Sequence, residues 1–170
     1  MSGLYGVGTT DLATLQNAAA APKLIRASKT FTGAANLGAV GVNELFTTTG
    51  AVLLDGFWVR CTSDLVDAVD GAFFEIGWTS VPNGFTAGGF LTPFDLDTIN
   101  SGDGLDLTNW VVGDGYAVSP ASTPSLAIFD NFIMTISAQN ITGGTLEFYV
   151  QYRPLSSDGA LTLGAGMVAI

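Results

Sequence analysis

The sequence predicts an all-β protein, an antiparallel β-sandwich of the jelly-roll or Greek-key type with an N-terminal arm that carries a short helix. Two observations predict the sandwich: apolar and polar residues alternate with a period of two in several short segments, and glycine-rich turns separate these segments. A third observation, a change in charge near residue 30, predicts the arm. The expected division is an arm over residues 1–30 and a sandwich domain over residues 31–170.

The expected arm differs from the rest of the chain in both charge and pattern. Residues 1–30 hold three cations and one acid, a net charge of +2, whereas residues 31–170 hold two cations and fourteen acids, a net charge of −12. A short helix is expected to begin at Thr10 as its N-cap and to end before Pro22. Its apolar stripe is narrow, so the helix needs another surface, either on its own domain or on a partner. The sandwich is expected to fold without this arm.

Four segments of the body alternate in the manner of strands with one buried face: Phe57–Thr62, Phe74–Trp78, Phe132–Ser137 and Thr145–Arg153. The last is the clearest, because Leu146, Phe148, Val150 and Tyr152 share one face. These strands should therefore face a common core.

Between these segments, turn residues and special positions predict local features. Residues 139–144 contain two glycines and predict a hairpin between the last two long strands, and Gly56 predicts a bulge. Cys61 is the only cysteine, which excludes an intramolecular disulfide and predicts a small buried side chain. The acidic residues Asp64, Asp67 and Asp70 are expected in a turn between two strands.

The overall composition excludes several classes of function. The chain has five Lys and Arg against fifteen Asp and Glu, a net charge of −10, and it has no His. Five cations cannot neutralise many phosphates, so nucleic acid is not expected as a partner. Without His there is no Ser-His-Asp triad, and we expect no enzymatic activity. No signal peptide and no long apolar run is visible, so we expect no membrane partner and a protein that is made in a cytoplasm.

An irregular acidic stretch near the middle of the chain is the main candidate for a metal. Asp95, Asp97, Asp103 and Asp106 supply the hard oxygen ligands that Ca²⁺ prefers. The EF-hand spacing fails, because Ile99 occupies the fifth position of such a loop. We therefore expect a solvated acidic loop and no cofactor, with a weak structural calcium site as the alternative.

The three tryptophans are candidates for stacking against a ligand. Trp110 follows the acidic stretch and is the best candidate for an exposed ligand-binding aromatic residue. Trp58 lies opposite Phe57 in its strand and is expected to be partly exposed, whereas Trp78 shares a face with core residues. Packing is the commoner role for each of them.

The whole-chain pattern resembles bacteriophage head decoration (cement) proteins. The resemblance is carried by the expected arm, by a Gly-, Thr- and Asp-rich, Lys-poor sandwich, and by the strand Leu146–Pro154 with the tail Leu155–Leu163. Such proteins are small sandwiches on the capsid exterior, often trimeric. The resemblance implies a structural virion protein, a homotrimer that binds and stabilises the lattice of the major capsid protein.

We expect the arm to make the main contact with the capsid, through the residues Leu12, Leu15, Lys23, Arg26 and Lys29. Only 12% of residues are charged, and depletion of charge is typical of interface cores. The alternative is a carbohydrate- or receptor-binding module of a phage fibre or tail, or another tail structural protein. A glycosidase on the same fold would need two carboxyl groups facing each other across a cleft.

Overall fold

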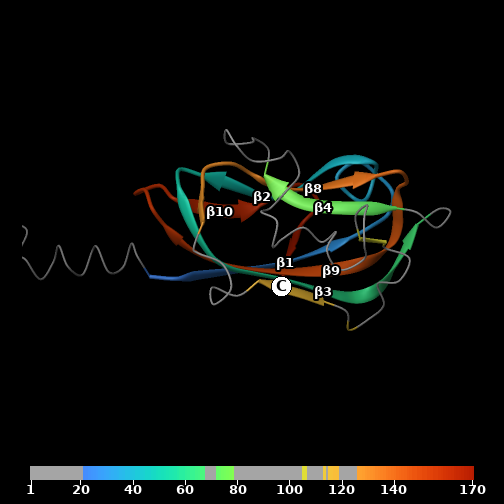
Figure 1. Ribbon diagram of the computed structural model, residues 1–170, viewed down its shortest axis with the longest axis horizontal. Helices are drawn as coiled ribbons and strands as arrows, with labels where there is room; N and C mark the ends of the chain where they lie inside the picture. Colours follow the sequence, from blue (N-terminus) through green and yellow to red (C-terminus); the bar gives the residue numbers. More distant parts are fainter. Residues whose placement is uncertain (1–20, 68–71, 79–104, 107–112, 114, 119–125) are drawn as a thin grey trace, which may run out of the picture.

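The alternating segments form two antiparallel β-sheets that pack face to face (Figure 1). The computed structural model describes residues 21–67, 72–78, 105–106, 113, 115–118 and 126–170, and this part of the chain contains no helix. The strands are β1 (Lys23–Thr30), β2 (Gly41–Thr49), β3 (Val52–Asp67), β4 (Phe73–Trp78), β5 (Leu105–Asp106), β6 (Gly115–Val118), β7 (Leu126–Ile128), β8 (Phe132–Ser137), β9 (Ile141–Pro154), β10 (Ala160–Leu163) and β11 (Val168–Ala169). The prediction of an all-β protein with two antiparallel sheets is confirmed.

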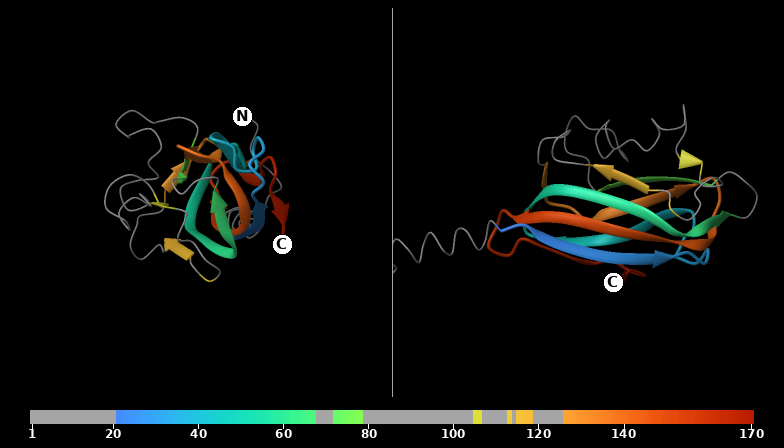
Figure 2. Two further views of the ribbon diagram at one scale, coloured as in Figure 1. Left: turned by 90° about the vertical axis from the view of Figure 1, so that its right-hand side faces the viewer. Right: turned by 90° about the horizontal axis from the view of Figure 1, so that it is seen from below.

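Successive strands pass back and forth between the two sheets. The six-stranded sheet has the order β11-β1-β9-β3-β6, with β7 also paired to β3, and the five-stranded sheet has the order β10-β2-β8-β4-β5. From β1 to β4, and again from β7 to β11, each strand lies in the sheet opposite its predecessor. Figure 2 shows the two layers end-on and from below. Most contacts between neighbouring strands therefore join residues far apart in sequence.

The connection between β8 and β9 corrects one prediction. A hairpin was expected over residues 139–144, but β8 pairs with β2 and β4 whereas β9 pairs with β1 and β3. The connection is therefore an arch between the two sheets. Alternation reveals which side chains face the core, and strands on opposite sides of one core share that pattern. The pattern cannot tell a hairpin from an arch.

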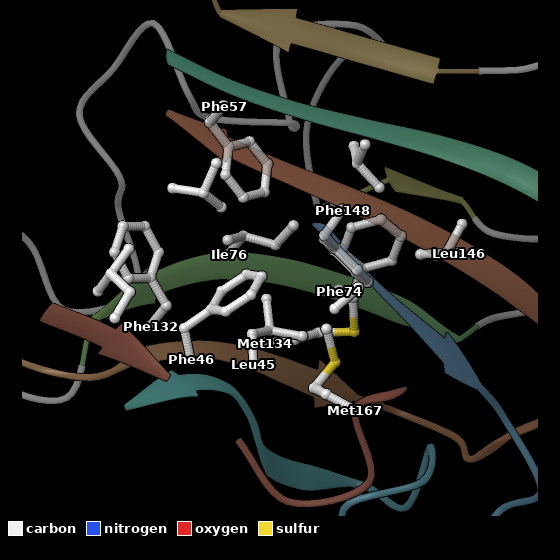
Figure 3. Packing of buried hydrophobic residues seen from close by; sticks show 14 of the residues in the cluster. Leu45, Phe46, Phe57, Phe74, Ile76, Phe132, Met134, Leu146, Phe148 and Met167 are labelled. Atoms are coloured by element: carbon white, nitrogen blue, oxygen red, sulfur yellow. The ribbon is translucent and has the colours of Figure 1, made fainter. Parts of the chain in front are cut away.

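The core between the sheets is aromatic and aliphatic. Phe57 and Phe148 come from the six-stranded sheet, and Phe46 and Phe132 come from the five-stranded sheet (Figure 3). The rings of Phe57 and Phe132 stack across the interface with centroids 6.4 Å apart and planes 3° apart. Phe132 also makes an edge contact with Phe46, with a centroid distance of 6.2 Å. This cluster joins the two layers directly.

Strand β3 is longer than the sequence predicts. Its register against β9 shifts between Leu54 and Gly56, which confirms the bulge, and Cys61 is buried in it as expected. Asp64 and Asp67 lie within β3, so the turn expected there is wrong for these two residues. Asp67 accepts a hydrogen bond from the backbone N–H of Ala72 at 2.8 Å, which holds the chain where it leaves the strand. Asp70 lies outside the described residues.

Strand β1 corrects the expected boundary of the arm. All eight residues of Lys23–Thr30 pair with β9, and Ala27 and Ser28 also pair with β11 on the other side. The structure therefore places residues 23–30 inside the six-stranded sheet, where the sequence predicted an arm. Three cations in this segment obscured the alternation, because one of them points into the core. The helix expected to begin at Thr10 lies outside the described residues.

Candidate functional site

The outward surface of the six-stranded sheet gathers aromatic and charged side chains from three strands. The register of β1, β9 and β3 places Arg26 beside Tyr149 and Tyr149 beside Trp58. The next outward cross-strand pairs on either side add further side chains to this surface. We call this surface the outer sheet face, formed by Leu24, Arg26, Ser28, Trp58, Arg60, Glu147, Tyr149 and Gln151.

A groove of about 450 Å³ lies on the outer sheet face, at the end where β1 begins. Its lining residues are Pro22, Lys23, Leu24, Trp58, Tyr149 and Gln151. Leu24 is 59% exposed, which is high for a leucine within a strand. The volume lies within the roughly 300–1,000 Å³ typical of small-molecule sites.

Trp58 lies against the sheet because Gly56 has no side chain and leaves room for the indole. A Cβ atom at position 56 would lie 2.5 Å from Cη2 of Trp58, so the six-membered part of the indole occupies that space. Trp58 is half-buried, in agreement with the partial exposure expected from its strand. The bulge glycine therefore provides room for an aromatic platform on the surface.

The charges near the groove are arranged around one carboxylate. The Tyr149 hydroxyl donates to Oε2 of Glu147 at 2.7 Å, and Arg60 lies 3.2 Å from the same oxygen. The hydrogen bond to Glu147 raises the pKa of Tyr149 above its ordinary value. Lys23 lines the groove, and Arg26 pairs with Tyr149 beside it. Among the described residues, cations therefore outnumber carboxylates around the groove, whereas the chain as a whole carries −10.

The structure separates the residues expected to contact a capsid. Lys23 and Arg26 are exposed near the groove, whereas Lys29 is completely buried and cannot contact a partner while the sandwich is folded. Leu12 and Leu15 lie outside the described residues. So do Trp110 and the acidic residues Asp95, Asp97 and Asp103, whereas Asp106 lies in β5.

Lys29 has a structural role, and the prediction that it contacts a capsid is wrong. Its ammonium group donates to the carbonyl oxygens of Glu44 at 2.8 Å and Ala165 at 2.9 Å. It thereby joins β1 to β2 and to the C-terminal segment. Burial lowers the pKa of Lys29 from 10.5 to about 8, and the charge of Glu44 partly opposes this shift. The signal was present in the sequence, because Lys29 continues the inward positions of Ile25 and Ala27.

The lowered pKa of Lys29 predicts a pH-dependent stability. Between pH about 8 and 10.5 the folded chain binds fewer protons at Lys29 than the unfolded chain, so unfolding takes up a proton. The free energy of unfolding should therefore rise with pH in this interval, by at most about 1.4 kcal/mol per pH unit. Urea unfolding from pH 7.5 to 10 measures this slope. Lys29→Met should show a smaller slope, and equal slopes for both proteins would contradict the assignment.

Comparison of the chain with protein-family models, with curated proteins and with solved structures gives no match. Within the described residues, no three His, Cys, Asp or Glu side chains are grouped in a way that could hold a metal ion. No helix in that part of the chain is long and apolar enough to cross a membrane. The function is therefore inferred from the surface and the topology.

Proposed function

We propose that this chain is a structural virion protein that decorates and stabilises a bacteriophage capsid by binding the major capsid protein, without catalysis. We infer a jelly roll from the strand order, because β1-β9-β3-β6 faces β2-β8-β4-β5 and the chain alternates between them. Jelly rolls recur in viral capsid and lectin domains. A fold alone does not determine function, so the proposal also needs a surface.

The observation that carries the proposal is a pair of exposed apolar side chains at one end of the sandwich. Phe129 is 68% exposed and Leu155 is 52% exposed. Val52 on β3 pairs with Ile128 on one side and with Pro154 on the other. Phe129 and Leu155 directly follow these two partners, so they lie at adjacent strand ends. We call this pair the apolar end.

The apolar end coincides with the start of β1. Lys23 pairs with Tyr152, two residues before Pro154, so residues 1–22 join the sandwich at this end. Exposed apolar patches on small proteins commonly mark contacts with other proteins. We infer that the residues that precede β1 and the apolar end together bind the capsid lattice.

Capsid binding by substituted proteins tests this proposal. Phe129→Ser combined with Leu155→Ser should weaken binding to capsids of the encoding phage about 100-fold. Burial of the two apolar side chains in the interface would contribute roughly 3 kcal/mol to the binding free energy, and the double variant loses this contribution. The matched control is Val42→Ser with Val66→Ser, because these valines are 58% and 52% exposed at the opposite end. Cosedimentation with capsids and circular dichroism of each variant provide the measurements. Equal binding by both folded double variants would contradict the assignment of the apolar end.

We also propose a homotrimer, the form that the resemblance to capsid decoration proteins implies. Light scattering at micromolar concentration should then give three times the chain mass of 17.5 kDa. A clean monomer would contradict the trimer. The alternative of a carbohydrate- or receptor-binding module that uses Trp110 stays a prediction, because Trp110 lies outside the described residues.

A further inference from the structure

We propose that the groove on the outer sheet face binds an anionic saccharide. The groove lies at the same end of the sandwich as the apolar end but shares no residue with it. Among the described residues, the groove combines an aromatic platform, available polar groups and an excess of positive charge. Each of these features favours one part of such a ligand.

The aromatic platform suits the apolar face of a sugar ring. Trp58 and Tyr149 are direct cross-strand partners on β3 and β9, and both point outward. The indole of Trp58 occupies the space above Gly56, so its position is fixed by the backbone. Pyranose rings present C–H groups on one face, and these pack on aromatic rings. A prearranged aromatic surface also loses little conformational entropy on binding.

The polar groups beside this platform are available for hydroxyl groups. Within the described part of the chain, no hydrogen bond engages the side-chain amide of Gln151, the indole N–H of Trp58 or the ammonium group of Lys23. All three residues line the groove together with Leu24. An amide offers both donors and an acceptor, which matches the mixed character of sugar hydroxyls.

The charge around the groove favours an acidic sugar over a neutral one. Glu147 already receives the hydroxyl of Tyr149 and the guanidinium of Arg60, so its charge is largely compensated. Lys23 lines the groove, and Arg26 is the cross-strand neighbour of Tyr149. A carboxylate, sulfate or phosphate on the ligand would meet these two cations.

Two other anionic occupants are less favoured. A long nucleic acid would experience repulsion from a chain of net charge −10. An added peptide strand would need a free sheet edge, but the groove lies over β1, β9 and β3, on the face of the sheet. A short acidic oligosaccharide needs only the face.

Binding of defined glycans tests the proposal. An array of sialylated, uronate-containing, sulfated and phosphorylated glycans, with their neutral counterparts, should show selective retention on acidic glycans. Titration calorimetry with sialyllactose and lactose then compares one anionic sugar with its neutral core. At least one acidic glycan should bind ten-fold or more tightly than its neutral counterpart.

Variants of the groove separate its components. Trp58→Ala should weaken binding of the retained glycan at least ten-fold, and Arg26→Gln should reduce the preference for the acidic over the neutral form. Gly56→Ala should also weaken binding, because its Cβ would displace the indole. Ser28→Ala, an outward substitution on β1 away from the groove, is the matched control and should leave binding unchanged.

The outcomes decide the proposal clearly. It is overturned if acidic glycans bind no better than neutral ones across the array, or if a folded Trp58→Ala protein binds as well as the parent. Tighter binding of an oligoglutamate peptide than of any glycan would also overturn it, in favour of a protein partner. Circular dichroism establishes that each variant is folded.

Discussion

A protein that lacks residues 1–30 should fail to fold. The deletion removes β1, which pairs with β9 along all eight of its residues. It also removes Ala27 and Lys29, which are fully buried, and it leaves β9 with an open edge beside the core. Small domains are stable by only roughly 5–15 kcal/mol, so the loss of this paired strand and of its buried side chains should unfold the sandwich.

Deletion of residues 1–20 is the matched control, because β1 begins only at Lys23. This shorter deletion should keep the β-sheet circular dichroism spectrum and a cooperative unfolding transition near that of the full chain. The 1–30 deletion should show neither. Cooperative unfolding of the chain without residues 1–30 would mean that β1 is dispensable for the fold.

Phe148→Ala should destabilise the sandwich by about 3–5 kcal/mol, the usual cost of removing a buried aromatic ring. Phe148 is fully buried, and its ring centroid lies 6.3 Å from that of Phe57. The next residue on the same strand provides the comparison. Tyr149 points to the outer sheet face, so Tyr149→Ala should cost about 1 kcal/mol or less.

Urea unfolding at neutral pH measures both variants. The urea midpoint of Phe148→Ala should fall much further than that of Tyr149→Ala, and the slope of the unfolding free energy against urea concentration should be similar for both. Similar losses at the two positions would show that the core does not lie between the sheets as described.

Alternation in the sequence was sufficient to assign the faces of the longest strands. In β9, the inward residues Leu146, Phe148, Val150 and Tyr152 are all buried, as predicted. It was insufficient to assign partners, because a strand in either sheet buries the same set of residues. The arch between β8 and β9 shows this most directly, since its turn residues are equally compatible with a hairpin.

The charge pattern of β1 is misleading. Lys23, Arg26 and Lys29 indicated a basic arm, yet Lys29 is buried, because two backbone carbonyls accept hydrogen bonds from its amine. Those acceptors belong to Glu44 and Ala165, which are distant in sequence. No local pattern could have predicted them.

The groove was only partly predictable. The partial exposure of Trp58 followed from its strand, but its neighbours on β9 depend on the register between β3 and β9. That register includes a bulge at Gly56, and one residue of slippage would place other side chains beside Trp58. The groove therefore became visible only with the sheet assembled.

The most direct test of the proposed function is a reconstruction of capsids of the encoding phage, assembled without this protein and then mixed with it. We expect additional density at regular positions on the outer surface of the lattice, of a size that fits the sandwich, with the apolar end toward the capsid. An unoccupied lattice at a saturating concentration of folded protein would contradict it.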